Sequence, residues 1–211
     1  MRYTDVVWDF NGTLMDDVGI SILTVNDMLS KRDMPITDRK EYFEKIEMPI
    51  IRYYEKMFDF NVTSLSELTR EFQAGYDSYL DTASLAENAE EVLEKFKNAG
   101  INQVIISSFP TEKIKNICEK RGILHYFSNI LGAEDIKAES KVERGVAFAK
   151  SRGKDAKIVA IGDLLHDYEM ASVMGADCIL YSGGHQSKED LSKCGVPVAD
   201  SMKDIERMIL K

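Results

Sequence analysis

The sequence predicts an α/β protein whose core is a doubly wound parallel sheet and which carries an inserted all-helical domain. Three observations support this fold class. From about residue 85 onward, short apolar runs alternate with helical patterns of about ten residues, which is typical of parallel strands joined by crossover helices. One further apolar run lies near the start, at residues 6–8. Residues 15–84 show helical periodicity without a convincing strand pattern.

The first predicted strand covers residues 6–8 and places Asp9 at its C-terminal end. Gly12 follows three residues later, so we expect a buried strand that ends on a carboxylate and then turns sharply. Asp9 and Asn11 would equally suit an ordinary turn after a strand. The residues that later strands place beside Asp9 therefore distinguish a functional carboxylate from an ordinary turn residue.

Residues 15–84 are predicted to form a block of about four helices. The first has one apolar face and ends near residues 32–35, and the second covers residues 37–47. The apolar face consists of Val18, Ile22, Val25, Met28 and Leu29. Pro49 breaks the second helix and suits the first turn of a third over residues 50–58. Ser64 with Glu67 forms a capping box for a longer fourth helix.

Strands and helices alternate after residue 85. The predicted strands are residues 103–107, 126–131, 157–162 and 178–181. The predicted helices are residues 88–100, 111–121, 140–150 and 168–174, and a last one that begins after Ser201. Pairs of residues mark three helix starts by their capping pattern: Asn88 with Glu91, Ser140 with Glu143, and Ser201 with Asp204. The second pair places Lys141 at the first position of its helix.

The composition is that of a globular chain. Of 211 residues, 44% are hydrophobic and 30% are charged, and the net charge is −9 without a basic stripe, which argues against a nucleic-acid partner. No apolar stretch approaches the roughly 20 residues that cross a bilayer, so no membrane partner is expected. The scattered cysteines are typical of thiols in a reducing compartment: Cys118, Cys178 and Cys194. We expect a cytoplasmic protein that is a monomer or dimer.

Polar side chains end three of the predicted strands: Asp9, Ser107 and Asp163. Parallel strands present their C-terminal ends at one edge of the sheet, where ligands bind. Asp9, Asp163 and Asp167 would gather there, and like charges share a small space only with a cation. Such oxygen ligands suit Mg²⁺, which bridges to phosphate. With the charge of Lys141, these are the parts of a phosphoryl-transfer site, in which an aspartate can be the nucleophile.

These residues resemble the motifs of the haloacid dehalogenase (HAD) superfamily of phosphatases. Residues 9–14, DFNGTL, resemble the first motif, DxDGT(L/V), and residues 162–167, GDLLHD, resemble the fourth, GDxxxD. Ser107 after an apolar strand is similar to the second motif, and Lys141 to the third. The motifs follow in the family order, and the resemblance covers nearly the whole chain.

The resemblance implies a Rossmann-like HAD core made of residues 1–14 and 85–211. Residues 15–84 would be the helical C1 cap of the phosphoglycolate-phosphatase-like branch. The implied activity is that of a Mg²⁺-dependent phosphatase for a small phosphorylated metabolite.

The family also implies roles for single residues. Asp9 would be the nucleophile, and Ser107 and Lys141 would hold the phosphoryl group. The Mg²⁺ ligands would be Asp9, the backbone carbonyl of Asn11, Asp163 and Asp167. The expected substrate-binding residues are Gly12, Thr13 and Ser108 in the core and Arg52 and Tyr53 in the cap.

Asn11 is a departure from the family pattern, in which this position is normally an aspartate that serves as general acid and base. Asparagine is nearly isosteric but cannot exchange a proton at neutral pH. Metal and phosphate binding should survive, whereas turnover could fall by about 10²–10⁴-fold. Two alternatives stay open. One is a protein that binds Mg²⁺ and a phosphorylated ligand in a regulatory role. The other is a C–P bond hydrolase that uses a cap lysine, with Lys31, Lys45 and Lys56 as candidates.

Other residues have competing interpretations. His166, between the two metal-ligand aspartates, is either a proton shuttle or a solvated residue at a helix start. His185 after the glycine pair is expected at the rim of the site. Lys137 could take the place of Lys141, but the capped helix start favours Lys141. Tyr53 with Tyr54 could pack between cap helices instead of contacting substrate.

Overall fold

The structure, a computed structural model, describes residues 3–47, 50–133 and 140–211. The chain divides into two compact units. Unit 1 comprises Met1–Met15 and Leu85–Lys211, and unit 2 comprises Asp16–Ser84. Pro49 and Lys137, both considered above, lie outside the described residues.

Unit 1 contains a six-stranded sheet in the order β5-β4-β1-β6-β7-β8, in which all neighbouring strands are parallel. Its strands are β1 (Asp5–Trp8), β4 (Asn102–Pro110), β5 (Asn129–Ala133), β6 (Ile158–Gly162), β7 (Asp177–Tyr181) and β8 (Val198–Ala199). The strand order reverses beside β1, which pairs with β4 on one side and β6 on the other. The prediction of a doubly wound parallel sheet is confirmed.

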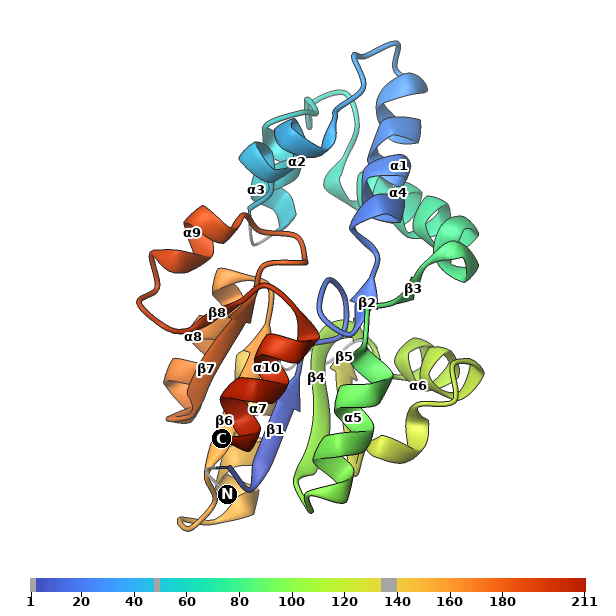
Figure 1. The fold of residues 1–211 in the computed structure, drawn as a ribbon. Coiled ribbons are helices and arrows are strands. Elements are labelled where there is room, and N and C mark those ends of the chain that lie inside the picture. The colour runs from blue at the N-terminus through green and yellow to red at the C-terminus, as the bar shows by residue number, and fades with distance from the viewer. Residues whose placement is uncertain (1–2, 48–49, 134–139) are drawn as a thin grey trace. The chain divides into compact units, whose positions relative to one another are not determined.

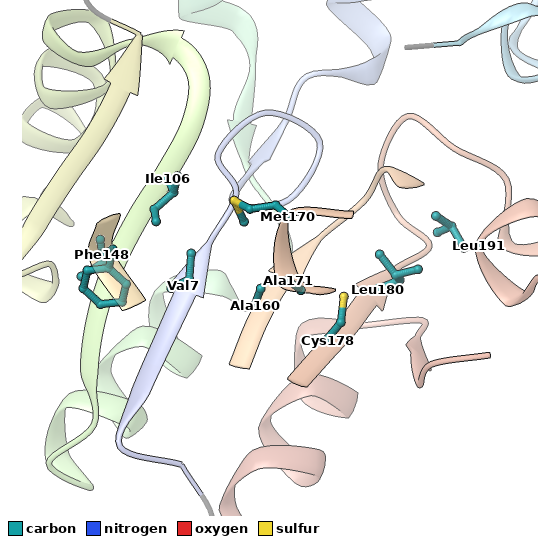
Figure 2. Close-up of a cluster of buried hydrophobic side chains, with 10 residues drawn as sticks. Val7, Ile106, Phe148, Ala160, Met170, Ala171, Cys178, Leu180 and Leu191 are labelled. Carbon is teal, nitrogen blue, oxygen red and sulfur yellow. The ribbon is translucent and has the colours of Figure 1, made fainter. Parts of the chain in front are cut away.

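Helices cover both faces of this sheet (Figure 1). The helices of unit 1 are α5 (Ala89–Asn98), α6 (Thr111–Lys120), α7 (Lys141–Arg152), α8 (Leu165–Met174), α9 (Lys188–Ser192) and α10 (Met202–Leu210), with a 3-10 turn η2 (Leu124–Tyr126). Val7 packs with Phe148 of α7 and Met170 of α8 (Figure 2). Trp8, the next residue, stacks on Phe96 of α5 with ring centroids 5.9 Å apart. Successive side chains of β1 thus enter opposite layers, and its four residues are all buried, which explains the continuous apolar run.

Unit 2 is helical, as predicted. It contains α1 (Val18–Ser30), α2 (Arg39–Lys45), α3 (Ile50–Glu55), α4 (Leu65–Tyr79) and a 3-10 turn η1 (Leu80–Thr82). The capping box of Ser64 and Glu67 is formed at the start of α4. The segments that link the units, β2 (Met15–Asp16) and β3 (Ser84–Leu85), form a two-stranded sheet. Within the described ranges, no helix is both long and apolar enough to span a bilayer.

Some local predictions are wrong. Asn88 precedes α5 in a left-handed conformation, with φ of 63°, and its side chain makes no capping hydrogen bond. β4 continues past Ser107 to Pro110, although its pairing with β5 shifts register between Ile106 and Pro110. α8 begins at Leu165, which brings Asp167 into its first turn. α9 and β8 were not predicted, because elements this short show no periodicity.

Candidate active site

The turn after β1 presents the Asp9 carboxylate at the C-terminal edge of the sheet. The Asp9 backbone N–H donates to the Ile161 carbonyl at 2.8 Å, which ties the turn to β6. Gly12 has φ of +70°, and a side chain there would collide with the carboxylate of Asp163 and the ring of His185. Glycine is therefore required at this position for two reasons, its backbone conformation and the close approach of its neighbours.

Asp163 follows β6 and is held by hydrogen bonds to both of its carboxylate oxygens. The Thr13 hydroxyl donates to one oxygen at 2.9 Å, and the His185 backbone N–H donates to the other at 2.7 Å. Thr13 was expected to contact substrate, and here its buried hydroxyl fixes Asp163. A side chain on Gly184 would also collide with Asp163. The loop after β7 thus closes directly on this carboxylate.

Asp167 lies in the first turn of α8. One of its oxygens accepts from the Leu164 backbone N–H at 2.9 Å, which satisfies one of the free donors at the helix start. Gly162 leaves room for this carboxylate, because a Cβ there would overlap it. The spacing of the GDxxxD pattern thus places Asp163 directly after β6 and Asp167 in the first turn of α8, and its glycine makes room for Asp167.

Lys141 is the first residue of α7, and the capping box of Ser140 and Glu143 is formed. Its Nζ lies 2.6 Å from Asp9 Oδ1 and 2.5 Å from Asp167 Oδ1. Its side chain is only 4% exposed. The structure therefore brings Lys141, Asp9 and Asp167 into direct contact, as a convergent site requires.

The carboxylates of Asp9, Asp163 and Asp167 have oxygen atoms within 4.8 Å of one another. Burial raises the pKa of Asp9 to about 6, against the lowering effect of Lys141 and with a further rise from Asp167. Burial likewise raises the pKa of Asp163 to about 7. Although burial lowers the pKa of Lys141, the two adjacent carboxylates outweigh it, and the net pKa is raised. When all three carboxylates are ionised, they exceed the Lys141 ammonium by two negative charges, so the oxygen ligands and the charge of this cluster fit a divalent cation.

Ser107 lies on β4 at the same edge. Trp8 of β1 pairs with Ile105 of β4 and with Ile161 of β6, so Asp9, Ser107 and Asp163 leave neighbouring strands at similar heights. Ser107 is buried and its hydroxyl accepts from the Phe109 backbone N–H at 3.2 Å. Ser108 is exposed. These positions are consistent with an anion-binding strand end.

Asn11 lies within the turn, half-buried, and forms an isolated β-bridge with Met15. The turn places it between Asp9 and Gly12, so its carbonyl belongs to the same loop as the proposed nucleophile. Its role toward a metal ion remains a prediction.

The candidate cap residues lie in unit 2. Arg52 is exposed and pairs with Glu55 at 3.2 Å. Tyr53 is buried against Tyr42 and Tyr54, with ring centroids 5.6 and 6.0 Å away, as the packing interpretation expects. Among the described residues, its hydroxyl has no hydrogen-bond partner. Substrate contact by either residue remains a prediction.

The cap lysines proposed for C–P bond cleavage are all at least partly exposed and paired with glutamates. Lys31 pairs with Glu71 at 3.1 Å, Lys45 with Glu41 at 3.9 Å, and Lys56 with Glu47 at 2.7 Å. A lysine that forms a Schiff base is activated by desolvation or by a neighbouring cation. In the part of the chain that the structure describes, each of these lysines is partly exposed, so none is desolvated as such activation requires.

The sequence did not indicate how the loop after β7 contacts the site. In addition to the His185 bond to Asp163, the side chain of Gln186 accepts from the Leu165 backbone N–H at 2.5 Å. The glycine pair directly after a strand was a signal for close backbone approach. His166 lies half-buried in the first turn of α8, with its Nδ1 3.2 Å from Glu169 Oε2.

Comparison with known proteins agrees with this geometry. A family model described as "Haloacid dehalogenase-like hydrolase" matches residues 6–181. A phosphoglycolate phosphatase of Vibrio parahaemolyticus is 20% identical over 97% of this chain and 95% of its own length. A probable phosphatase of Dickeya dadantii, IndB, is 26% identical over 88% of this chain and 84% of its own length. The structure of a predicted phosphatase from Clostridium acetobutylicum superposes with a TM-score of 0.78 at 24% identity, covering 100% of this chain and 99% of that one.

Proposed function

Because the chain belongs to the haloacid dehalogenase-like hydrolase family, we propose that its site hydrolyses a small phosphorylated metabolite through an aspartyl-phosphate on Asp9. The enzyme is a phosphatase of the phosphoglycolate-phosphatase-like kind, which the names of its relatives support. The observation that carries the mechanism is the buried contact of Asp9 and Asp167 with the Lys141 ammonium.

Asp9 is proposed to act as the nucleophile. A carboxylate oxygen of Asp9 forms a bond to phosphorus while the bond from phosphorus to the leaving oxygen breaks, and the leaving oxygen takes up a proton from solvent, because Asn11 cannot supply one. Water then attacks the phosphorus of the aspartyl-phosphate, which releases inorganic phosphate and restores Asp9. Lys141 and Ser107 would hold the phosphoryl oxygens, together with backbone groups of Gly12, Thr13 and Ser108.

The carboxylates of Asp9, Asp163 and Asp167 and the backbone carbonyl of Asn11 would hold Mg²⁺. The buried oxygen ligands and the uncompensated negative charge support this assignment. When bound, the ion supplies positive charge that neutralises the oxygens of the transferred group. Thr13 and the loop after β7 keep Asp163 in place for this role.

Unit 2 is proposed to be the cap that contributes substrate selectivity, with Arg52 and Tyr53 as candidate contacts. We also propose a cytoplasmic location and a small-molecule substrate rather than a nucleic acid or a membrane. The net charge of −9 and the lack of a basic stripe support this choice of partner.

Asn11 supports a second candidate function, in which the site binds Mg²⁺ and a phosphorylated ligand with negligible turnover. The asparagine leaves its backbone carbonyl unchanged but cannot donate or accept the catalytic proton. We expect turnover to be slower by about 10²–10⁴-fold than with an aspartate at this position. Substrates whose leaving group needs little protonation should suffer least.

Steady-state kinetics with Mg²⁺ on a panel of phosphomonoesters tests these alternatives. We expect Asp9→Asn to abolish activity and Asn11→Asp to raise kcat. A native protein that is indistinguishable from Asp9→Asn contradicts the catalytic proposal and leaves the binding function. Mass spectrometry must accompany the assay, because the Asn11-Gly12 pair can deamidate and create an active minor fraction.

A further inference from the structure

Arg144, on α7, contacts the strand end that carries Ser107. Its Nη2 donates to the backbone carbonyl of Ser107 at 2.8 Å. Lys141, one helical turn earlier, contacts Asp9 and Asp167, because residues three apart lie on the same face of a helix. One face of α7 therefore reaches both the carboxylate cluster and the proposed phosphate-binding strand end.

The Ser107 carbonyl lies where the sheet becomes irregular. β4 pairs regularly with β5 as far as Ile106, and then the register shifts before Pro110. Interruptions of a strand ladder, of which β-bulges are one kind, are found next to active sites, where they redirect side chains. At this point the Arg144 guanidinium, rather than regular strand pairing, holds the Ser107 backbone in position.

The bond also fixes the next N–H group. The Ser107 carbonyl and the Ser108 N–H belong to one planar peptide unit, and in a trans peptide they point in opposite directions. A carbonyl bonded to Arg144 therefore directs the Ser108 N–H away from the guanidinium. A hydrogen bond from a charged donor also polarises the peptide and strengthens that N–H as a donor.

The start of α7 is itself held firmly. The Ser140 hydroxyl accepts a hydrogen bond from the Glu143 backbone N–H, and the Glu143 carboxylate accepts one from the Ser140 backbone N–H. Gly145 lies so close to α8 that a Cβ there would be 2.7 Å from Met174 Sδ. The backbone that carries Arg144 is therefore held in place by the capping box and by the packing of α7 against α8.

We propose that Arg144 is a positioning residue for the phosphoryl group, which it serves by orienting the Ser107–Ser108 peptide so that the Ser108 N–H donates to phosphate. This inference rests on the proposed function, because it assigns Ser107 and Ser108 to phosphate binding. Neither the sequence motifs nor the composition single out Arg144.

Substitution of Arg144 tests the inference against a matched control on the same helix. Arg144→Met keeps the aliphatic stem and removes the donor, whereas Arg144→Lys keeps a charged donor. Arg152→Met is the control, because Arg152 Nε bonds to the buried Asp5 at 2.6 Å, at the opposite end of the sheet. The readouts are KM, kcat, the inhibition constant of inorganic phosphate, calorimetric phosphate binding with Mg²⁺, and the melting temperature.

We expect Arg144→Met to raise KM and the inhibition constant of phosphate in parallel by about tenfold, the effect of one lost charge-assisted hydrogen bond. Arg144→Lys should recover most of this loss. Arg152→Met should lower the melting temperature without changing phosphate affinity. Phosphate affinity within about twofold of native in Arg144→Met, or an equal loss in Arg152→Met, overturns the inference. A native protein that binds phosphate without turnover would contradict the catalytic proposal, while calorimetry would still decide on Arg144.

Discussion

The buried carboxylates predict how the stability of the metal-free protein depends on pH. In the folded protein the pKa of Asp9 is about 6 and that of Asp163 about 7, both raised chiefly by burial from the ordinary value of 3.8. Between these values and 3.8, the folded protein binds protons that the unfolded chain releases. Their stabilising contribution is fully present below about pH 4 and is lost as the pH rises through 6 and 7.

The magnitude follows from the same values. A rise in the pKa of Asp9 from 3.8 to about 6 corresponds to about 3 kcal/mol of unfolding free energy. Asp163 acts in the same direction, and because the two groups interact, their contributions are not summed. We therefore expect the contribution of this pair to fall by at least about 3 kcal/mol between pH 4 and pH 8.

Urea denaturation in the presence of a chelator, at pH values from 4 to 8, measures this effect. Other titrating groups contribute to the slope, so the comparison is with Asp163→Asn, which should show a weaker loss of stability with rising pH. Saturating Mg²⁺ should stabilise the native protein more at pH 8 than at pH 5, because the ion favours the charged carboxylates. Equal slopes for the native protein and Asp163→Asn would refute the reasoning.

Three substitutions give further tests. Lys141→Met should destabilise the chelated protein by about 3–5 kcal/mol at pH 8, because it leaves buried carboxylates without their cation; urea denaturation checks this, and a loss below about 1 kcal/mol would contradict it. Gly12→Ala should abolish activity and lower the melting temperature, because φ of +70° and the contact with Asp163 both exclude a side chain; native-like kinetics would count against this. Tyr53→Phe should stabilise the protein by about 1 kcal/mol in urea denaturation, because it removes a buried hydroxyl that lacks a partner within the described ranges. The control Tyr76→Phe should instead destabilise it, because that hydroxyl bonds to Asp17 at 2.6 Å.

Sequence patterns predicted the central strands β1, β4 and β6 well because these strands are buried on both faces over most of their length. A continuous apolar run such as residues 6–8 does not fit an amphipathic helix, and the runs of these three strands each lead to a polar residue at the same edge: Asp9, Ser107 and Asp163. The capping boxes at Ser64 and Ser140 were also predictable, because both members of each pair are local in sequence.

Contacts between distant segments were not predictable in the same way. The Arg144 bond to Ser107 and the His185 bond to Asp163 depend on how α7 and the loop after β7 pack. Asn88 shows the limit of local patterns: Asn is a good cap, but it also tolerates the left-handed conformation that it adopts here.

The position of β1 at the centre of the sheet affects the order in which the chain can fold during synthesis. β1 is synthesised before its partners β4 and β6, which begin at Asn102 and Ile158. The hydrogen bond from the Thr13 hydroxyl to Asp163 joins residues 150 positions apart. By contrast, the packed helices α1 and α4 of unit 2 both lie within the first half of the chain. The apolar residues of β1 therefore lack their sheet partners while unit 2 is synthesised, and unpaired apolar strands promote aggregation. A nascent chain that stops before β6 has all the residues of unit 2 and the proposed nucleophile, but lacks Asp163 and Asp167.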